Sequence, residues 1–297
     1  MTSLAYPRRP PSWPAATLDR GVHEPRSTDL EYHRARGPDD VPTWSPSSAT
    51  LIYGDYDAIL VDALATYDQA DALADWIDTK GRRLSRIYIT HGHGDHWLGL
   101  ARLIQRFPGA KGLATSEVLA RVQFEAGPGM AGYWEGIFPG EVPTGADKVL
   151  PQLLTTDTID LEGNELRVIR ISQADTAEST VLYAPSLAAV VTGDLAYNEV
   201  HMMTAETGEA ERAQWIVNLG EVAALEPTFV VAGHKKVENN NDPKIIGESQ
   251  QISPGSCPKR PRPLASSPGW SNAIRIGATS ARSGIPREQP SLGRTAR

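Results

Sequence analysis

The stretch that decides the fold is ITHGHGDHWLGL, residues 89–100. Three histidines and an aspartate fall within six positions of it, in a chain of 297 residues that holds only seven histidines. The apolar run RIYIT (86–90) directly before them is bounded by polar residues and predicts a buried strand. The histidines therefore begin where a strand ends.

The spacing of these side chains points to a metal site. In an extended segment that leaves a strand, positions two apart point to the same side, so His91 and His93 can converge on one point. Asp95 and His96 lie at the turn into the next predicted helix and can face a second point nearby. Imidazole nitrogen and carboxylate oxygen together suit zinc or another borderline divalent metal. The alternative, a polar loop whose histidines face solvent, does not account for this spacing.

Outside the motif, strands and helices alternate, with hairpins among them. The patterns predict strands at 50–53, 57–63, 86–90, 110–115, 158–161, 165–172, 179–185, 188–194 and 228–234, and helices at 68–81, 97–107, 116–126 and 208–225. Asp68 and Ser116 are the expected N-caps, and residues 127–150 read as a long loop. The fold class is therefore α/β, with mixed rather than purely parallel sheets.

Composition and charge limit where the protein is expected and which partners it is expected to bind. Hydrophobic residues make up 40% and charged residues 22% of the chain, as in a soluble globular protein. No apolar run is long enough to cross a membrane, and the N-terminus lacks the apolar segment of a secretory signal, so we expect a cytoplasmic location. The net charge of −7 argues against nucleic acid or an anionic membrane as a partner. The expected partner is a small-molecule substrate, and the oligomeric state stays open.

Both ends of the chain differ from its middle. Residues 1–43 are rich in proline and arginine, and residues 251–297 are rich in proline, serine, glycine and arginine with almost no apolar periodicity. Such segments bury too little surface to offset their ordering entropy, so we expect both to be disordered. The folded domain is expected at 44–250. The tail reads either as a natural disordered segment or as the product of a frameshift or gene-model error.

THGHGDH (90–96) matches the T-H-x-H-x-D-H signature of the metallo-β-lactamase-fold hydrolases. The resemblance continues in the family's order through Asp62 in LVDA, Asp194 in VVTGD and His234 in VVAGH, and it covers residues 44–250. It implies a four-layer αβ/βα sandwich, in which two mixed sheets lie face to face with helices outside and metals at the edge of the sheets.

The resemblance also implies roles for single residues. The implied ligands are His91 and His93 for a first metal, Asp95, His96 and His234 for a second, and Asp194 as the bridge between them. A water between the metals would ionise and attack a carbonyl or similar centre, which gives Asp95 and Asp194 catalytic as well as ligand roles. One or two zinc ions per chain are implied, with iron as an alternative. Asp62 is expected beneath the loop as a structural partner.

One family position is altered. Family members carry a further histidine before the bridging aspartate, and the matching stretch here is RISQADTAESTVLY. We place that position at Gln173, a poor zinc ligand, with Asp175 as an alternative donor if the loop shifts. Two hypotheses follow: an active hydrolase with an altered first site, or a catalytically impaired protein of the same fold. A mononuclear iron, persulfide-type oxygenase is a third.

The substrate is less well defined. Tyr197, Asn198 and His201 follow the bridging aspartate, where similar proteins form a pocket wall, so Tyr197 and His201 are the candidate substrate-binding residues. The aromatic stretch 127–143 is either an apolar lid or core packing. We expect an amide, lactone, ester or thioester of a small, partly apolar molecule. Lys235 and Lys236 would suit the carboxylates of a glutathione thioester.

Overall fold

The computed structural model describes residues 18–23, 44–127 and 130–252. The disorder expected for residues 1–17, 24–43 and 253–297 lies outside the described residues. Within the N-terminal segment, however, residues 19–23 form strand β1 (Asp19–His23), which pairs antiparallel with the strand that begins at Ala49. This strand moves the start of the folded domain to before residue 44. The backbone of β1 pairs with β2 at the edge of the sheet, although the sequence of β1 shows no apolar alternation.

The first sheet is mixed and has six strands in the order of the sequence. Its strands are β1, β2 (Ala49–Tyr53), β3 (Asp57–Val61), β4 (Arg83–Tyr88), β5 (Lys111–Ala114) and β6 (Gln152–Leu153). From β1 to β3 neighbours are antiparallel, and from β3 to β6 they are parallel. The parallel part needs crossovers, which are α1 (Tyr67–Asp78), α2 (Gly94–Trp97), α3 (Leu100–Arg106), α4 (Ser116–Ala126) and α5 (Ala131–Ile137).

The second sheet has five strands in the order β12-β10-β9-β8-β7. Its elements are β7 (Thr158–Leu161), β8 (Asn164–Gln173), β9 (Ala177–Ala184), β10 (Ala189–Val191) and β12 (Phe229–Val231), with helices α6 (Glu209–Ala223) and α7 (Lys244–Ser249). Only the β10–β12 pair is parallel. A short parallel pair, β11 (Tyr197–Asn198) and β13 (His234–Lys235), stands beside it.

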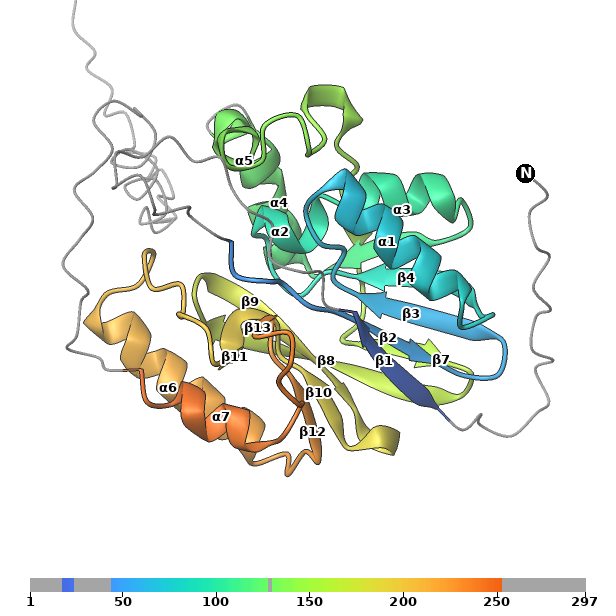
Figure 1. The fold of residues 1–297 in the computed structure, drawn as a ribbon. Coiled ribbons are helices and arrows are strands. Elements are labelled where there is room, and N and C mark those ends of the chain that lie inside the picture. Colours follow the sequence, from blue (N-terminus) through green and yellow to red (C-terminus); the bar gives the residue numbers. More distant parts are fainter. Residues whose placement is uncertain (1–17, 24–43, 128–129, 253–297) are drawn as a thin grey trace, which may run out of the picture. The chain divides into compact units, whose positions relative to one another are not determined.

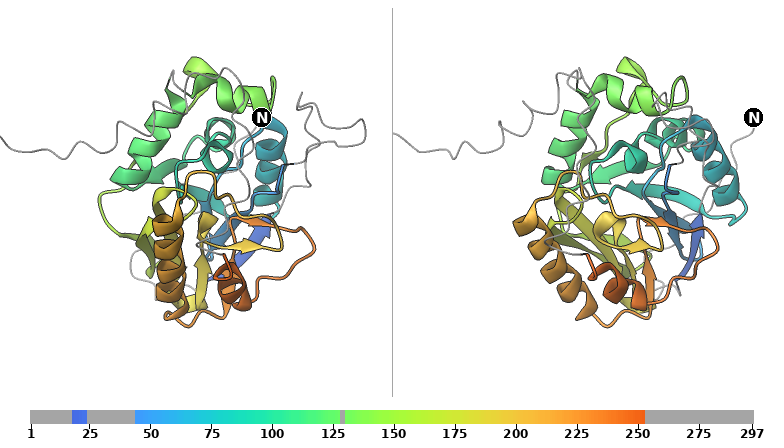
Figure 2. Two further views of the ribbon diagram at one scale, coloured as in Figure 1. Left: turned by 90° about the vertical axis from the view of Figure 1, so that its left-hand side faces the viewer. Right: turned by 60° about the vertical axis from the view of Figure 1, so that its left-hand side comes forward.

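Three apolar clusters separate four layers. One lies between the six-stranded sheet and α1–α5, one between the two sheets, and one between the five-stranded sheet and α6 and α7. Strand β3 shows why: Leu60 faces the helices, while Ile59 and Val61 face the other sheet, because successive side chains of a strand point to opposite faces. Figures 1 and 2 show the helices on the two outer faces. The predicted αβ/βα sandwich is confirmed.

Both predicted helix N-caps are corrected by the structure. Helix α1 is capped by Thr66 in a capping box with Gln69 rather than by Asp68, and α4 is capped by Thr115 rather than by Ser116. Each true cap is the preceding threonine in an extended conformation, as a cap residue requires.

The predicted loop 127–150 contains helix α5. Its glycines hid the helical spacing of Trp134, Ile137 and Phe138, which are all buried in the cluster beneath α1–α5. Trp44 contacts the rings of Trp134 and Phe138 edge-on, with centroids 5.5 and 5.6 Å away. Of the two alternatives for this stretch, core packing describes these three side chains.

Among the described residues, no helix is both long and apolar enough to span a bilayer.

Candidate metal centre

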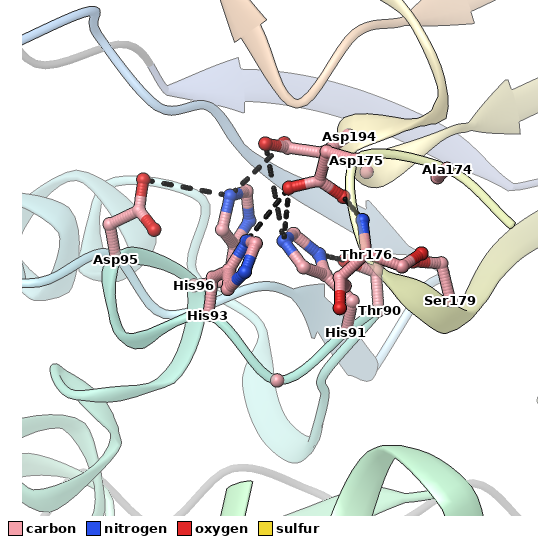
Figure 3. Close-up of polar contacts among 12 residues, drawn as sticks. Thr90, His91, His93, Asp95, His96, Ala174, Asp175, Thr176, Ser179 and Asp194 are labelled. Atoms are coloured by element: carbon pink, nitrogen blue, oxygen red, sulfur yellow. Dashed lines mark hydrogen bonds and ion pairs between the residues drawn. The ribbon is translucent and has the colours of Figure 1, made fainter. Parts of the chain in front are cut away.

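Histidine and aspartate side chains from four segments meet at one edge of the two sheets. Figure 3 shows those of three segments, and His234 comes from the fourth. The first group is His91, His93, Asp175 and Asp194, the second is Asp95, His96 and His234, and the ligand atoms in each lie within 4.8 Å of one another. The segments are the start of α2 after β4, the β8–β9 turn, the turn after β10 and the start of β13. The structure thus brings together all the predicted ligand residues and, with them, Asp175, the alternative donor for the first group.

Asp194 stands between the two groups. Its Oδ1 lies 3.2 Å from His96 Nε2, and its Oδ2 lies 3.2 Å from His234 Nε2 and 4.0 Å from His91 Nε2. Gly193 and Gly233 make this approach possible. Gly193 has φ +49°, and a Cβ on Gly233 would stand 2.1 Å from Asp194 Oδ1. The Asp194 carboxylate thus lies close to histidines of both groups.

Within the part of the chain that the structure describes, four buried atoms of the cluster make no hydrogen bond. They are His91 Nε2, His96 Nε2, Asp175 Oδ2 and Asp194 Oδ1. Buried polar atoms are ordinarily hydrogen-bonded, so four such atoms in one cluster require another partner. Imidazole nitrogens and carboxylate oxygens that converge in this way fit a divalent metal.

The outer ring nitrogens fix the direction of the imidazoles. His91 Nδ1 lies 3.1 Å from Thr90 Oγ1, and His234 Nδ1 lies 3.0 Å from the carbonyl oxygen of Ser45. A proton held on Nδ1 leaves the Nε2 lone pair for a metal. His93 has the opposite orientation: its Nδ1 faces the cluster, 2.7 Å from Asp175 Oδ2.

Asp62 holds the ligand loop from below. Its Oδ1 accepts the backbone N–H of Thr90 at 2.8 Å, and its Oδ2 accepts the Thr90 hydroxyl at 2.8 Å and lies 2.9 Å from His96 Nδ1. Asp62 is 1% exposed and has φ +63°. The predicted role as a structural partner is confirmed, because one carboxylate aligns both the strand end and a ligand.

Replacing Asp62 by alanine is expected to lower the free energy of unfolding by about 3 kcal/mol, because two buried donors and an imidazole lose their partner. Urea unfolding of the metal-free protein measures the change. Asp55→Ala, at an exposed turn position, is the control and should stay within about 0.5 kcal/mol of the parent. Equal stability of the two variants would contradict the role given to Asp62.

The charges within the cluster favour cations. Burial lowers the pKa of His93, but the carboxylates of Asp175 and Glu206 outweigh it, and the pKa lies well above its ordinary value. Burial is likewise outweighed at His234, where Asp194 and Asp95 raise the pKa to about 10. Burial raises the pKa of Asp175 to about 6 against the opposing effect of His93.

The pKa values of His91 and Asp194 are both lowered. Burial and the neighbouring His96 hold the pKa of His91 well below its ordinary value. At Asp194 burial is outweighed by His234 and His96, which leaves the pKa of the carboxyl well below its ordinary value. A divalent metal supplies the positive charge that this set of carboxylates attracts.

Asp175, and not Gln173, completes the first group. Gln173 is the last residue of β8 and pairs with Ala177, so residues 174–176 form the turn and Asp175 stands at its apex. The Gln173 amide donates to the carbonyl oxygen of Ala174 at 3.0 Å. The interpretation of Gln173 as the altered ligand position is therefore corrected to Asp175, two residues on.

The candidate substrate-binding residues lie in different surroundings. The Tyr197 hydroxyl donates to Asp194 Oδ2 at 2.6 Å, and its ring stacks on His234 at 5.5 Å. Asn198 instead donates to the carbonyl oxygen of Asn240, and His201 is exposed. Tyr197 is thus part of the centre's surroundings, whereas Asn198 is bonded within the loop after β13.

Lys235, a candidate for binding substrate carboxylates, is 1% exposed. Its ammonium donates to the carbonyl oxygen of Asn239 at 2.7 Å and to Asn241 Oδ1 at 3.1 Å. Its charge is held inside the fold, which argues against that role, while Lys236 is exposed.

Sequence reasoning missed the partners of Asp95. The Ser47 hydroxyl donates to Asp95 Oδ2 at 2.9 Å, and Trp44 Nε1 donates to the same oxygen at 3.3 Å. Both residues precede β2 in a stretch with no motif. Their place beside the ligand groups follows from the isolated bridge between Ser47 and His234, which no sequence pattern predicts. They hold the carboxylate of a proposed ligand.

The fold and the two groups of histidine and aspartate side chains point to a class of metal-dependent proteins. A sequence model of the Metallo-beta-lactamase superfamily matches residues 42–234, and the chain belongs to this superfamily. Residues of the chain are 37% identical over 67 positions to a hydroxyacylglutathione hydrolase of Francisella tularensis subsp. novicida (strain U112). That match covers 23% of this chain and only 25% of the relative's length.

Solved structures agree with this fold. A metallo-beta-lactamase from Pontibacter korlensis superposes with a TM-score of 0.54 at 18% identity, over 77% of this chain and 97% of that one. FIM-1, a metallo-beta-lactamase from Pseudomonas aeruginosa solved in a mono-zinc form, gives a TM-score of 0.53 at 14% identity, over 80% and 90% of the two chains. At these identities the likeness shows the fold alone.

Proposed function

We propose that this protein is a metallo-hydrolase with two metals that share Asp194. The observation that carries the proposal is the pair of buried ligand groups, which contain four buried atoms without a hydrogen bond among the described residues. The first metal would be held by His91, His93, Asp175 and Asp194, and the second by Asp95, His96, His234 and Asp194. Zinc is the metal we propose, because imidazole and carboxylate ligands around a buried point suit it.

A bound metal pair would supply a water that ionises near neutral pH. The chain's own residues orient the centre. Asp194 is fixed by the Tyr197 hydroxyl, and Asp95 is fixed by Ser47 and Trp44. These contacts hold the carboxylate oxygens in place, so that little reorganisation is needed during reaction.

The substrate we propose is an amide, lactone, ester or thioester of a small, partly apolar molecule in the cytoplasm. Membership in the Metallo-beta-lactamase superfamily and the partial match to a hydroxyacylglutathione hydrolase support the reaction type. The apolar character rests on Trp44, whose partly buried ring lies beside Asp95.

An impaired protein is the less supported hypothesis. Its case rested on the loss of a first-group ligand at Gln173, and Asp175 now stands among the ligands of that group. A carboxylate in place of an imidazole changes the donor type without removing a donor.

A second candidate is a mononuclear iron oxygenase that acts on a persulfide. Two histidines and one carboxylate are the ligand set of many non-haem iron centres, and His91, His93 and Asp175 provide it. Oxygen uptake with glutathione persulfide by the iron-loaded protein would support this candidate over the hydrolase.

A panel of lactam, lactone and thioester substrates tests the proposed function. We expect one class to be hydrolysed by the zinc-loaded protein, activity to disappear with a chelator, and zinc to restore it. Inertness of the metal-loaded protein toward the whole panel would contradict the hydrolase.

Replacing Tyr197 by phenylalanine is expected to lower kcat about tenfold, because Asp194 loses the hydrogen bond that orients it. Steady-state kinetics on the best panel substrate measure the effect, with Tyr183→Phe on β9 as the matched control. A change in KM alone would instead make Tyr197 a substrate contact.

A further inference from the structure

A partly buried carboxylate outside both ligand groups reaches the first group. Glu206 lies in the loop between β11 and α6, and its Oε1 stands 3.3 Å from His93 Nε2, the ring nitrogen that points away from the cluster. No sequence pattern indicated Glu206, because this loop has neither periodicity nor a motif.

Arg121 on α4 holds this carboxylate with two bonds. Its two terminal nitrogens donate to Glu206 Oε2 at 2.9 Å and to Oε1 at 2.7 Å, and one of them also donates to Glu125 at 2.8 Å. A bidentate pair of this kind fixes the direction as well as the position of the carboxylate. Because its partner is fixed, the ring of His93 is held from outside.

The ligand motif makes room for this arginine. A Cβ on Gly92 would stand 2.2 Å from Arg121 Cγ. The glycine between His91 and His93 therefore lets the arginine stem lie against the ligand loop. Any larger residue there would push away the group that anchors Glu206.

Glu206 also contacts the turn that carries the other carboxylate of this group. The Thr176 hydroxyl lies 3.3 Å from Glu206 Oε2, and Thr176 follows Asp175 directly. One side chain thus contacts His93 and the neighbour of Asp175, two segments far apart in the sequence.

The contact has a chemical consequence at His93. A carboxylate beside Nε2 would keep a proton on that nitrogen, so that Nδ1, the atom that faces Asp175, would be the one to offer its lone pair to a metal. His91, His96 and His234 use the opposite arrangement, with Nε2 inward. His93 alone among them therefore depends on an acceptor at its Nε2 side.

We propose that Glu206, held by Arg121, is a positioning residue for the first metal group. Glu206 sets the tautomer of His93 and supports the turn that carries Asp175. The inference rests on the proposed two-metal centre. The competing explanation is that the Arg121–Glu206 pair only ties the loop to α4.

Zinc titration of the metal-free, full-length protein against a chromophoric chelator separates the two explanations. Glu206→Ala is expected to weaken one of the two zinc dissociation constants by about 10- to 100-fold, and to leave the other unchanged. Glu206→Gln keeps an acceptor oxygen of nearly the same shape and should recover part of the loss. Glu209→Gln, which removes an exposed charge three residues away, is the matched control and should bind zinc as the parent does.

Asp175→Ala identifies the affected site, because adding it to Glu206→Ala should weaken the same zinc and not the second one. Equal weakening of both zincs by Glu206→Ala, or no weakening, would overturn the inference while leaving the metal centre in place. A folded parent protein that binds no zinc would overturn the proposed function itself, and the inference with it.

Discussion

Replacing Asp194 by asparagine is expected to reduce kcat/KM by more than about 100-fold. A loss of about 100-fold is the largest that is typical of residues that only support a metal ligand. Among the residues that the structure describes, Asp194 is the one carboxylate that lies within 4.0 Å of His91, His96 and His234 together. An amide offers one weak donor oxygen where the carboxylate offers two, so both metals would lose a ligand. Kinetics and metal content of the same preparation measure the effect.

Asp147→Asn, at an exposed position, is the control for this variant and should leave both quantities at the level of the parent. If Asp194→Asn kept its metal and its activity, the place of Asp194 between two metals would be refuted. Loss of activity with full metal content would show instead that its role is in the reaction and not in binding.

Replacing Asp175 by alanine is expected to remove one metal and to weaken its binding by at least about 100-fold, whereas Gln173→Ala should keep both. The β8–β9 turn places the carboxylate 2.7 Å from His93 Nδ1 and leaves the amide bonded to Ala174. Metal content of the two alanine variants, measured side by side, decides between the two positions. Loss of a metal from Gln173→Ala alone would contradict the structure's assignment.

Asp175→His extends this test to the choice of metal. An imidazole in place of the carboxylate should keep two metals and raise the preference for zinc over manganese, because carboxylate oxygen suits the harder ion. Competition between zinc and manganese for the metal-free protein measures the ratio. An unchanged ratio would mean that Asp175 does not contact the metal.

Much of the centre was predictable because its residues stand where strands end. His91, His93 and His96 follow β4, Asp194 follows β10, and His234 follows β12, and strand ends at a common sheet edge bring such side chains together. The apolar runs that identify the strands therefore also locate these ligands. The same runs predicted an α/β fold with mixed sheets, whereas the four-layer packing was implied by the resemblance to the metallo-β-lactamase-fold hydrolases.

The rest depends on contacts that no local pattern encodes. The register of the β8–β9 hairpin, in which Gln173 pairs with Ala177, decides that Asp175 and not Gln173 enters the cluster. Glu206 and Ser47 reach the centre from irregular segments, so their roles appear only in three dimensions. Strand β1 was missed for a related reason, because pairing with β2 supplies order that its own sequence does not show.

The most direct test of the central claim is the metal content of the purified full-length protein, measured by inductively coupled plasma mass spectrometry. Two ligand groups that share Asp194 predict about two zinc ions per chain. One iron per chain in place of zinc would favour the oxygenase candidate. A folded protein without any bound metal, which also failed to take up zinc when it was supplied, would contradict the account.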